Sequence, residues 1–480
     1  MTNNPPDPKP DQDKPVAAPA SPANSAPPQA KSTWAALLAI NSSTGALLGA
    51  ILLVCMGSEL WDKFLPKYMQ DLFRKDQVLS ISAAVIMTIA VYGTFRDFLE
   101  AVNYLLGGWI AGKFNTRRGL LLFNAAPLAG LAILFLWHNT IAVFLAIPFV
   151  FVWDSLAGPA LLTVVGDSLP SDRRAMAFSM QSLLRRLARV IAYGVNAGIV
   201  VAAGRAYGAS QEGQEQAAQA TMHAAFAISF VVVLASLLVQ MRFMKTASED
   251  KGTIIHKPLS VLRGFDPQLK RLLAADIFAR LAEGMPRELF VIFIVPALMV
   301  STGMEYTHAW AVYGVLLIVS QVTSAITYLP MGALASKPGL GKRPYIGLTF
   351  FFFATFPAVL AGMGYLAVAR IAPASLVILL MGVAYVFAGM REIGEPARKA
   401  MIVDLIPPAM KTQSIGIYWS ARCVAVMLAP IVGGAVWVGA NLVAGRSAVD
   451  PTGPGPFAMM LASSLCGAVG VVYYYARFGK

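Results

Sequence analysis

Long runs of apolar residues, separated by short polar loops, dominate the chain from about residue 45 onward. Twelve of these runs approach or exceed the roughly 20 residues that a helix needs to cross a bilayer. The first six are 45–66, 86–111, 119–137, 141–165, 176–202 and 221–243. The second six are 271–299, 307–334, 345–366, 376–403, 412–440 and 455–476. The pattern predicts an all-α membrane protein with twelve transmembrane helices in two six-helix halves.

Two polar segments divide the chain into regions. Residues 1–34 are rich in Pro, Ala, Ser and Asn and hold almost no large apolar side chain, which predicts a disordered tail. Residues 244–270 predict a linker between an N-terminal half, 35–243, and a C-terminal half, 271–480. The tail could also dock a partner.

Charge fixes the expected orientation. Hydrophobic residues make up 57% of the chain and charged residues only 13%, about half the share of a soluble domain. With the N-terminus inside, the inner loops hold 16 Lys and Arg and the outer loops hold 6. This bias predicts both termini in the cytoplasm of a bacterial-type cytoplasmic (inner) membrane. The net charge of +13 then reflects topology, and no nucleic acid partner is expected.

The two halves share a weak internal repeat. An offset of about 237 residues superposes Pro159 on Pro396, Asp167 on Asp404 and Arg185 on Arg422. Two six-helix halves are the architecture of many secondary carriers, whose site lies at the midplane between the halves.

Two basic loops resemble a motif of the major facilitator superfamily, Gly-x-x-x-Asp-Arg-x-Gly-Arg-Arg. The first loop supplies Gly108, Lys113, Arg117 and Arg118. The second supplies Gly332, Lys337, Gly341, Lys342 and Arg343. Asp167, with Pro170, Arg173 and Arg174, resembles the family's loop between helices 4 and 5, and Asp404 begins a similar Asp-x-x-Pro loop in the second half. "MREIGEPARKAMIVDL" is similar to a widespread bacterial subgroup. The resemblance implies the superfamily fold over about 45–476, alternating access, a small-molecule substrate and a monomer.

The chain departs from the family pattern at two points. Gly112 and Ser336 stand where the motif has its carboxylate, so the inner gate must be held in another way. The arginine that drug/proton antiporters of the family carry early in helix 4 is missing from "LAIPFVFVWDSL". The second departure weakens the antiporter hypothesis without excluding it.

The run 86–111 contains Arg96, Asp97 and Glu100, and ionisable side chains inside a membrane span usually have a partner or a function. Arg96 and Glu100 are one helical turn apart and could form a local ion pair. Alternatively, Asp97 or Glu100 carries a coupling proton, because burial favours the protonated form of a carboxylate.

The run 176–202 contains Arg185, Arg186 and Arg189. Arg185 and Arg189 share a helix face, whereas Arg186 points about 100° away and is expected to contact a neighbouring helix. Pairing with Asp154 or with the carboxylates of 86–111 is one interpretation. The other is an anion-binding role for Arg185, with Arg422 as its repeat-related partner.

Further charges lie in three other runs. Gly284 and Pro286, beside Glu283 and Arg287, predict a break in the helix. Glu59, Asp62 and Lys63 lie toward the outer end of the first run, which favours a solvated outer mouth. Arg391 and Glu392 precede Pro396, and the repeat suggests that Arg391 pairs with Asp154.

These observations predict a secondary active transporter of a small organic solute, with a lean toward an organic anion and with proton coupling. Proton-coupled efflux of amphipathic compounds, and a non-transporting assembly factor or sensor, are the alternatives. No enzymatic activity, cofactor or metal is expected. The candidate substrate and coupling residues are Arg185, Arg422, Arg96, Asp97, Glu100, Asp154, Arg189, Glu283, Arg287, Arg391 and Glu392. The candidate gate residues are Gly108, Lys113, Arg117, Asp167, Gly332, Lys337, Arg343 and Asp404.

Overall fold

A computed structural model gives the fold. The chain divides into two units, 1–40 and 41–480. The structure describes residues 42–76, 82–113, 116–152, 155–156, 171–243, 258–335, 341–406 and 411–478. The predicted tail, 1–34, lies outside these ranges, as does most of the predicted linker.

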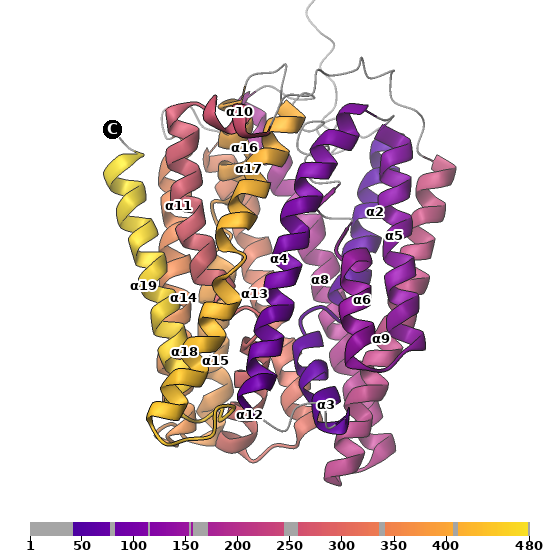
Figure 1. Ribbon diagram of the computed structural model, residues 1–480, viewed down its shortest axis with the longest axis vertical. Helices are drawn as coiled ribbons and strands as arrows, with labels where there is room; N and C mark the ends of the chain where they lie inside the picture. The colour runs from indigo at the N-terminus through magenta and orange to yellow at the C-terminus, as the bar shows by residue number, and fades with distance from the viewer. Residues whose placement is uncertain are drawn as a thin grey trace, which may run out of the picture. The chain divides into compact units, whose positions relative to one another are not determined.

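Every regular element in these ranges is a helix (Figure 1). The helices of the first part of the chain are α2 (Ser42–Glu59), α3 (Leu65–Asp76), α4 (Ser82–Lys113), α5 (Thr116–Leu136), α6 (Thr140–Val150), α8 (Ser171–Tyr207) and α9 (Gln211–Phe243). Those that follow are α10 (Pro258–Arg263), α11 (Pro267–Gly284), α12 (Phe290–Thr302), α13 (Tyr306–Ala335), α14 (Arg343–Val368), α15 (Ala374–Met390), α16 (Glu395–Asp404), α17 (Lys411–Val426), α18 (Ala429–Val443) and α19 (Pro454–Arg477).

Many of these helices are built to cross a membrane. Seven in the described ranges are long and apolar enough: Ser182–Tyr207, Gln211–Phe243, Tyr306–Ala335, Arg343–Val368, Ala374–Asp404, Gln413–Val443 and Pro454–Arg477. Four shorter apolar helices accompany them: Gly49–Glu59, Leu121–Leu136, Thr140–Val150 and Phe290–Thr302.

Several predicted spans are interrupted helices. The predicted run 45–66 ends as a helix at Glu59, and the chain resumes as α3 at Leu65. The run 271–299 breaks between Gly284 and Phe290, which confirms the predicted break at Gly284 and Pro286. The runs 376–403 and 412–440 also break, between α15 and α16 and between α17 and α18.

A proline accompanies each of these breaks. Pro66, Pro396 and Pro430 are the second residues of α3, α16 and α18, and Pro286 lies in the segment before α12. Proline has no N–H to donate to the preceding turn, and it clashes with the carbonyl four residues earlier. It is tolerated in the first turn of a helix, so a new helix starts beside it.

Apolar side chains lie on the outside of the bundle as well as in its core. Large apolar side chains face outward, among them Val443, Leu465 and Ile326, which are 93%, 69% and 68% exposed. Charged side chains lie inside, and Asp276 and Arg398 are each 1% exposed. A bilayer solvates apolar groups and cannot solvate charges, so the polar groups gather at the centre of the bundle.

Helices from distant parts of the sequence enclose this polar centre. α8 packs along α13, and α4 packs along α17 and α18. α14 and α11 pack against α19, while α9 packs against α2 and α5. In Figure 1, α3 and α12 lie at the lower end, and α10 and the C-terminus lie at the upper end.

Candidate substrate-binding site

A cavity of about 340 Å³ occupies the middle of the helix bundle. Helices α2, α4, α8, α11, α13, α15 and α17 contribute to its wall. Eight basic side chains line it: Lys63, Arg96, Arg186, Arg189, Arg280, Arg287, Arg391 and Arg422. Six acidic side chains line it as well: Glu59, Asp62, Asp97, Glu100, Glu283 and Glu392. The volume is within the range of sites for small organic molecules.

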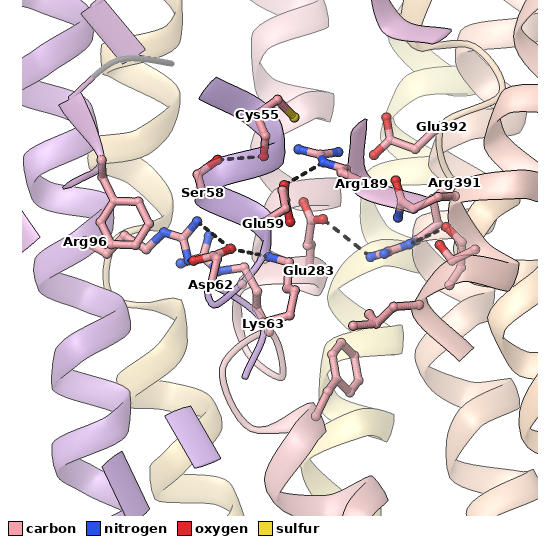
Figure 2. A pocket seen from close by; sticks show the side chains of 18 of the residues that line it. Cys55, Ser58, Glu59, Asp62, Lys63, Arg96, Arg189, Glu283, Arg391 and Glu392 are labelled. Atoms are coloured by element: carbon pink, nitrogen blue, oxygen red, sulfur yellow. Dashed lines mark hydrogen bonds and ion pairs between the residues drawn. The ribbon is translucent and has the colours of Figure 1, made fainter. Parts of the chain in front are cut away.

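The helix breaks place many of these charged side chains at a similar depth in the bundle. Figure 2 shows Glu59, Asp62 and Lys63 at the end of α2 and in the turn that follows it. Glu283 and Arg287 flank the end of α11 in the same way. Arg391 and Glu392 lie between α15 and α16. Unwound backbone is tolerated at membrane depth where it faces protein or a polar cavity, as it does here.

One wall of the cavity is a ladder of alternating charges between α4 and two helix breaks. Asp62 forms an ion pair with Lys63 Nζ at 3.0 Å and accepts from Arg96 Nη1 at 2.7 Å. Arg96 Nη1 also lies 3.7 Å from Glu288 Oε1. Glu288 accepts from Arg287 Nε at 2.7 Å, and Arg287 Nη2 donates to Asp97 Oδ1 at 2.9 Å. The ladder links α4 directly to the segment between α11 and α12.

The opposite wall of the cavity holds more arginines than carboxylates. Arg189 Nε and Tyr193 Oη each donate to Glu59 at 2.5 Å. Glu283 accepts from Arg280 at 2.6 Å and lies 3.5 Å from Arg391. Arg391 also lies over the rings of Phe353 and Phe356, with 5.3 Å and 4.6 Å to their centroids.

Arg186 joins α8 to α13 within this wall. Its Nη1 donates to Gln321 Oε1 at 2.6 Å, and its Nη2 donates to Tyr328 Oη at 2.9 Å. The same Nη2 lies 3.0 Å from Glu392 Oε2. Three groups therefore hold a guanidinium that is only 9% exposed.

The sequence matches the Major Facilitator Superfamily over residues 101–430, more than half of the chain. The chain belongs to this superfamily. With its apolar helices, this makes the molecule a multi-pass membrane protein of a transporter family.

Solved structures of superfamily transporters share the fold. The human organic anion transporter MFSD10 (TETRAN) matches with a TM-score of 0.61 and 14% identity, over 90% of this chain and 99% of its own. The nucleoside transporter NupG matches with a TM-score of 0.61 and 13% identity, over 90% and 100%. An auto-inhibited POT family peptide transporter matches with a TM-score of 0.60 and 12% identity, over 91% and 97%. A search of curated protein sequences gives no significant match. At these identities the likeness concerns the fold alone.

In this superfamily member, most of the predicted substrate and coupling residues line one cavity. They are Arg96, Asp97, Glu100, Arg189, Glu283, Arg287, Arg391, Glu392 and Arg422. Arg185 is not part of the cavity wall, and its backbone carbonyl accepts from Cys55 Sγ at 3.7 Å. Asp154 lies outside the described residues, so its predicted pairing with Arg391 stays a prediction.

Two sequence interpretations need correction. The local Arg96–Glu100 ion pair is wrong, because Arg96 reaches across to Asp62 and lies over the Phe151 ring at 4.1 Å. The solvated outer mouth around Glu59 and Asp62 is also wrong. These side chains line the central cavity, and the two residues are 6% and 4% exposed. Helical periodicity alone could not reveal this, because the chain unwinds after Glu59.

The predicted gate residues lie at helix ends. Gly108 and Lys113 are in the last turns of α4, and Arg117 is in the first turn of α5. Asp167 and Lys337 lie outside the described residues. The others are buried Gly332 in α13, exposed Arg343 at the start of α14, and Asp404, which ends α16 and forms an ion pair with Lys342.

Arg280, Arg186 and several tyrosines were not predicted as site residues. Arg280 was visible as a charge within a membrane span. Tyr193, one turn after Arg189, could have been found from its spacing. Tyr313 and Tyr385 line the cavity from α13 and α15, and nothing in their local sequence signals this.

Proposed function

We propose that this superfamily member is a secondary active transporter that moves a small organic solute bearing an anionic group across a bacterial-type cytoplasmic membrane. The observation that carries the proposal is the central cavity, whose wall holds eight basic and six acidic side chains. Arginine binds carboxylate and phosphate groups through paired hydrogen bonds. Because basic side chains outnumber acidic ones in this wall, the cavity favours an anionic group over a lipophilic cation, which disfavours the multidrug alternative.

Twelve spans in two halves are part of this proposal. Counting each interrupted helix as one span, the described helices other than the short α10 supply twelve segments, six on each side of the linker. The contacts of α8 with α13 and of α4 with α17 and α18 would then join the two halves. The cavity would lie between them, where alternating access requires the site. The basic loops would place the upper end of Figure 1, where α10 and the end of α19 lie, on the cytoplasmic side.

Proton coupling has a candidate in the charge ladder. Asp97 and Arg287 come from different proposed halves and lie 2.9 Å apart. Protonation of Asp97 would remove the charge that holds Arg287, which would loosen the contact between the halves. Proton binding and the movement of the halves would thereby become linked.

Uptake into proteoliposomes tests the function. The panel holds mono- and dicarboxylates, sugar phosphates and amino acids, each offered with and without an inward proton gradient. We expect at least one anionic compound to be taken up, faster with the gradient, and Arg391→Gln to reduce its uptake about tenfold or more. Glu212→Gln, at the exposed start of α9, is the matched control and should leave uptake unchanged.

Two results would contradict the proposal. The first is a failure to take up any compound of the panel by protein that is correctly folded and inserted. The second is transport of lipophilic cations that Arg391→Gln does not affect, which would favour the efflux alternative.

A further inference from the structure

The charges around the cavity are divided unequally between its two walls. The α4 wall consists of the ladder residues and Glu100. At the cavity surface it has three carboxylates (Asp62, Asp97 and Glu100) against three cations (Lys63, Arg96 and Arg287), and the ladder residue Glu288 does not line the cavity. The arginine wall has five cations (Arg186, Arg189, Arg280, Arg391 and Arg422) against three carboxylates (Glu59, Glu283 and Glu392). The cavity therefore has one side with balanced charges and one basic side.

The residues behind the arginine wall do not cancel this excess. Arg398 pairs with both Asp276 and Glu395, and Lys399 Nζ lies 3.8 Å from Glu395. Two cations thus face two carboxylates in this second layer. The surplus positive charge stays at the cavity surface.

The α4 wall has carboxylate oxygens without partners. Asp97 Oδ2 is buried and accepts no hydrogen bond, although Arg287 occupies Oδ1. Within the described residues, Glu100 makes no hydrogen bond or ion pair, and it lines the cavity three residues further along α4. Residues three apart share a helix face, so the two carboxylates lie on the same side of α4. A buried carboxylate oxygen without a donor is unfavourable, and a cationic group would satisfy it.

The arginine wall has an open donor. Arg422 Nη1 is buried and makes no hydrogen bond, and its nearest carboxylate oxygen, Asp276 Oδ2, is 3.7 Å away and already binds Arg398. The Arg422 guanidinium lies 4.0 Å from the ring centroid of Trp419. Such a contact fixes the plane of the guanidinium and leaves its edge able to donate to an acid group.

We propose that the transported solute is zwitterionic, with a cationic group recognised by Asp97 and Glu100 and an acid group recognised by Arg422. The inference rests on the proposed transport function and specifies its substrate class. An amino acid or dipeptide has the two charges and the size that a cavity of about 340 Å³ accommodates. A simple organic anion would satisfy Arg422 and leave the oxygens of Asp97 and Glu100 without a donor.

Matched ligand series test this on the purified full-length protein. Amino acids and dipeptides are each offered as the zwitterion, as the N-acetylated anion and as the C-amidated cation, and binding is measured from the shift of the thermal unfolding midpoint. We expect the zwitterion of at least one series to bind about tenfold or more tightly than either modified form. In the Glu100→Gln variant, the zwitterion should no longer bind more tightly than the N-acetylated form. In the Arg422→Gln variant, it should no longer bind more tightly than the C-amidated form.

Controls separate recognition from misfolding. Each variant must unfold cooperatively, and Glu100→Asp, which keeps the carboxylate, should retain a preference for the zwitterion. Glu212→Gln should leave all affinities unchanged. N-acetylated forms that bind as tightly as the zwitterions would overturn the inference and would assign Glu100 to protons alone. Absence of a shift with every zwitterion would overturn it too. In either case, uptake of simple anions in the proteoliposome assay would leave the transport proposal standing.

Discussion

The pair Asp97 and Arg287 shows how a single residue keeps its charge inside this bundle. Asp97 is 2% exposed, and Arg287 donates to it and to Glu288. Moving two charges out of water costs more free energy than a poorly aligned ion pair gains. Such a pair is therefore stable only with good geometry and further hydrogen bonds. Removing Asp97 still leaves Arg287 paired with Glu288, whereas removing Arg287 leaves the Asp97 charge without an ion-pair partner among the described residues.

Arg287→Gln should therefore destabilise the protein by about 3 kcal/mol, because it leaves Asp97 charged and buried. The double variant Asp97→Asn with Arg287→Gln should recover part of this loss, because it removes the uncompensated charge as well. Thermal unfolding in detergent measures both. The pair Arg446–Asp450, whose arginine is 60% exposed, is the control, and Arg446→Gln should cost less than about 1 kcal/mol. A double variant less stable than either single variant would argue against this account.

At the scale of elements, the helix breaks are held open by their neighbours. Gly433 in α18 lies against the break between α11 and α12. A Cβ built on Gly433 would lie 2.2 Å from the carbonyl oxygen of Met285. That oxygen belongs to backbone and cannot rotate away. The close approach fixes the segment that carries Arg287 and Glu288, so a glycine in one helix positions charges in another.

Gly433→Ala should push α18 away from the break, destabilise the protein by about 1–3 kcal/mol and reduce transport. Gly439→Ala, on the same helix, is a close control because nothing lies within 4 Å of its Cβ position. That variant should keep full transport and gain up to about 1 kcal/mol from helix propensity. Unfolding midpoints and uptake rates test both variants. Equal behaviour of the two would show that the contact with Met285 does not position the site.

At the scale of the whole described unit, contacts between distant segments lie at the lower end of Figure 1. Tyr306 Oη donates to Asp71 at 2.7 Å, and Lys67 donates to the other oxygen of Asp71 at 2.7 Å. Gln214 donates to Glu305 at 2.9 Å. The rings of Phe64 and Trp310 stack, with 5.4 Å between centroids. These contacts join α3 and α9 to the start of α13, and the proposed alternating access would require them to break.

Tyr306→Phe should favour opening at this end, because it removes a hydrogen bond to a buried carboxylate. The reporter is Ser320→Cys, in the cavity wall, on a background in which Cys55, Cys423 and Cys466 are replaced. A membrane-impermeant maleimide added from the lower side should label it about tenfold faster in the Tyr306→Phe variant. Tyr365→Phe, whose side chain is 56% exposed, is the control. Unchanged labelling would mean that other contacts alone keep this end closed.

Predictions from the local sequence pattern were correct for features that depend on residues close together in the sequence. Apolar runs predicted helices, and Gly284 with Pro286 predicted the break between α11 and α12. The same approach misplaced Glu59 and Asp62, because it extended a regular helix through Leu60–Phe64. It also assigned Arg96 to Glu100 on the same helix, since a partner from another helix is not visible in sequence. The internal repeat favoured Arg185 over Arg186 as a site residue, yet of these two arginines only Arg186 lines the cavity.

The sequence by itself determined that this chain forms a bundle of apolar helices with charged side chains inside. Its long apolar runs predict the helices, and charged residues and prolines interrupt several of these runs. It also determined which charged residues had to find partners, since a bilayer cannot solvate them. Only the tertiary structure decided which partners they found. Asp62 with Arg96, Asp97 with Arg287 and Arg186 with Glu392 join residues from 34 to more than 200 positions apart. Such pairs depend on how whole helices pack, and no local period in the sequence encodes that packing.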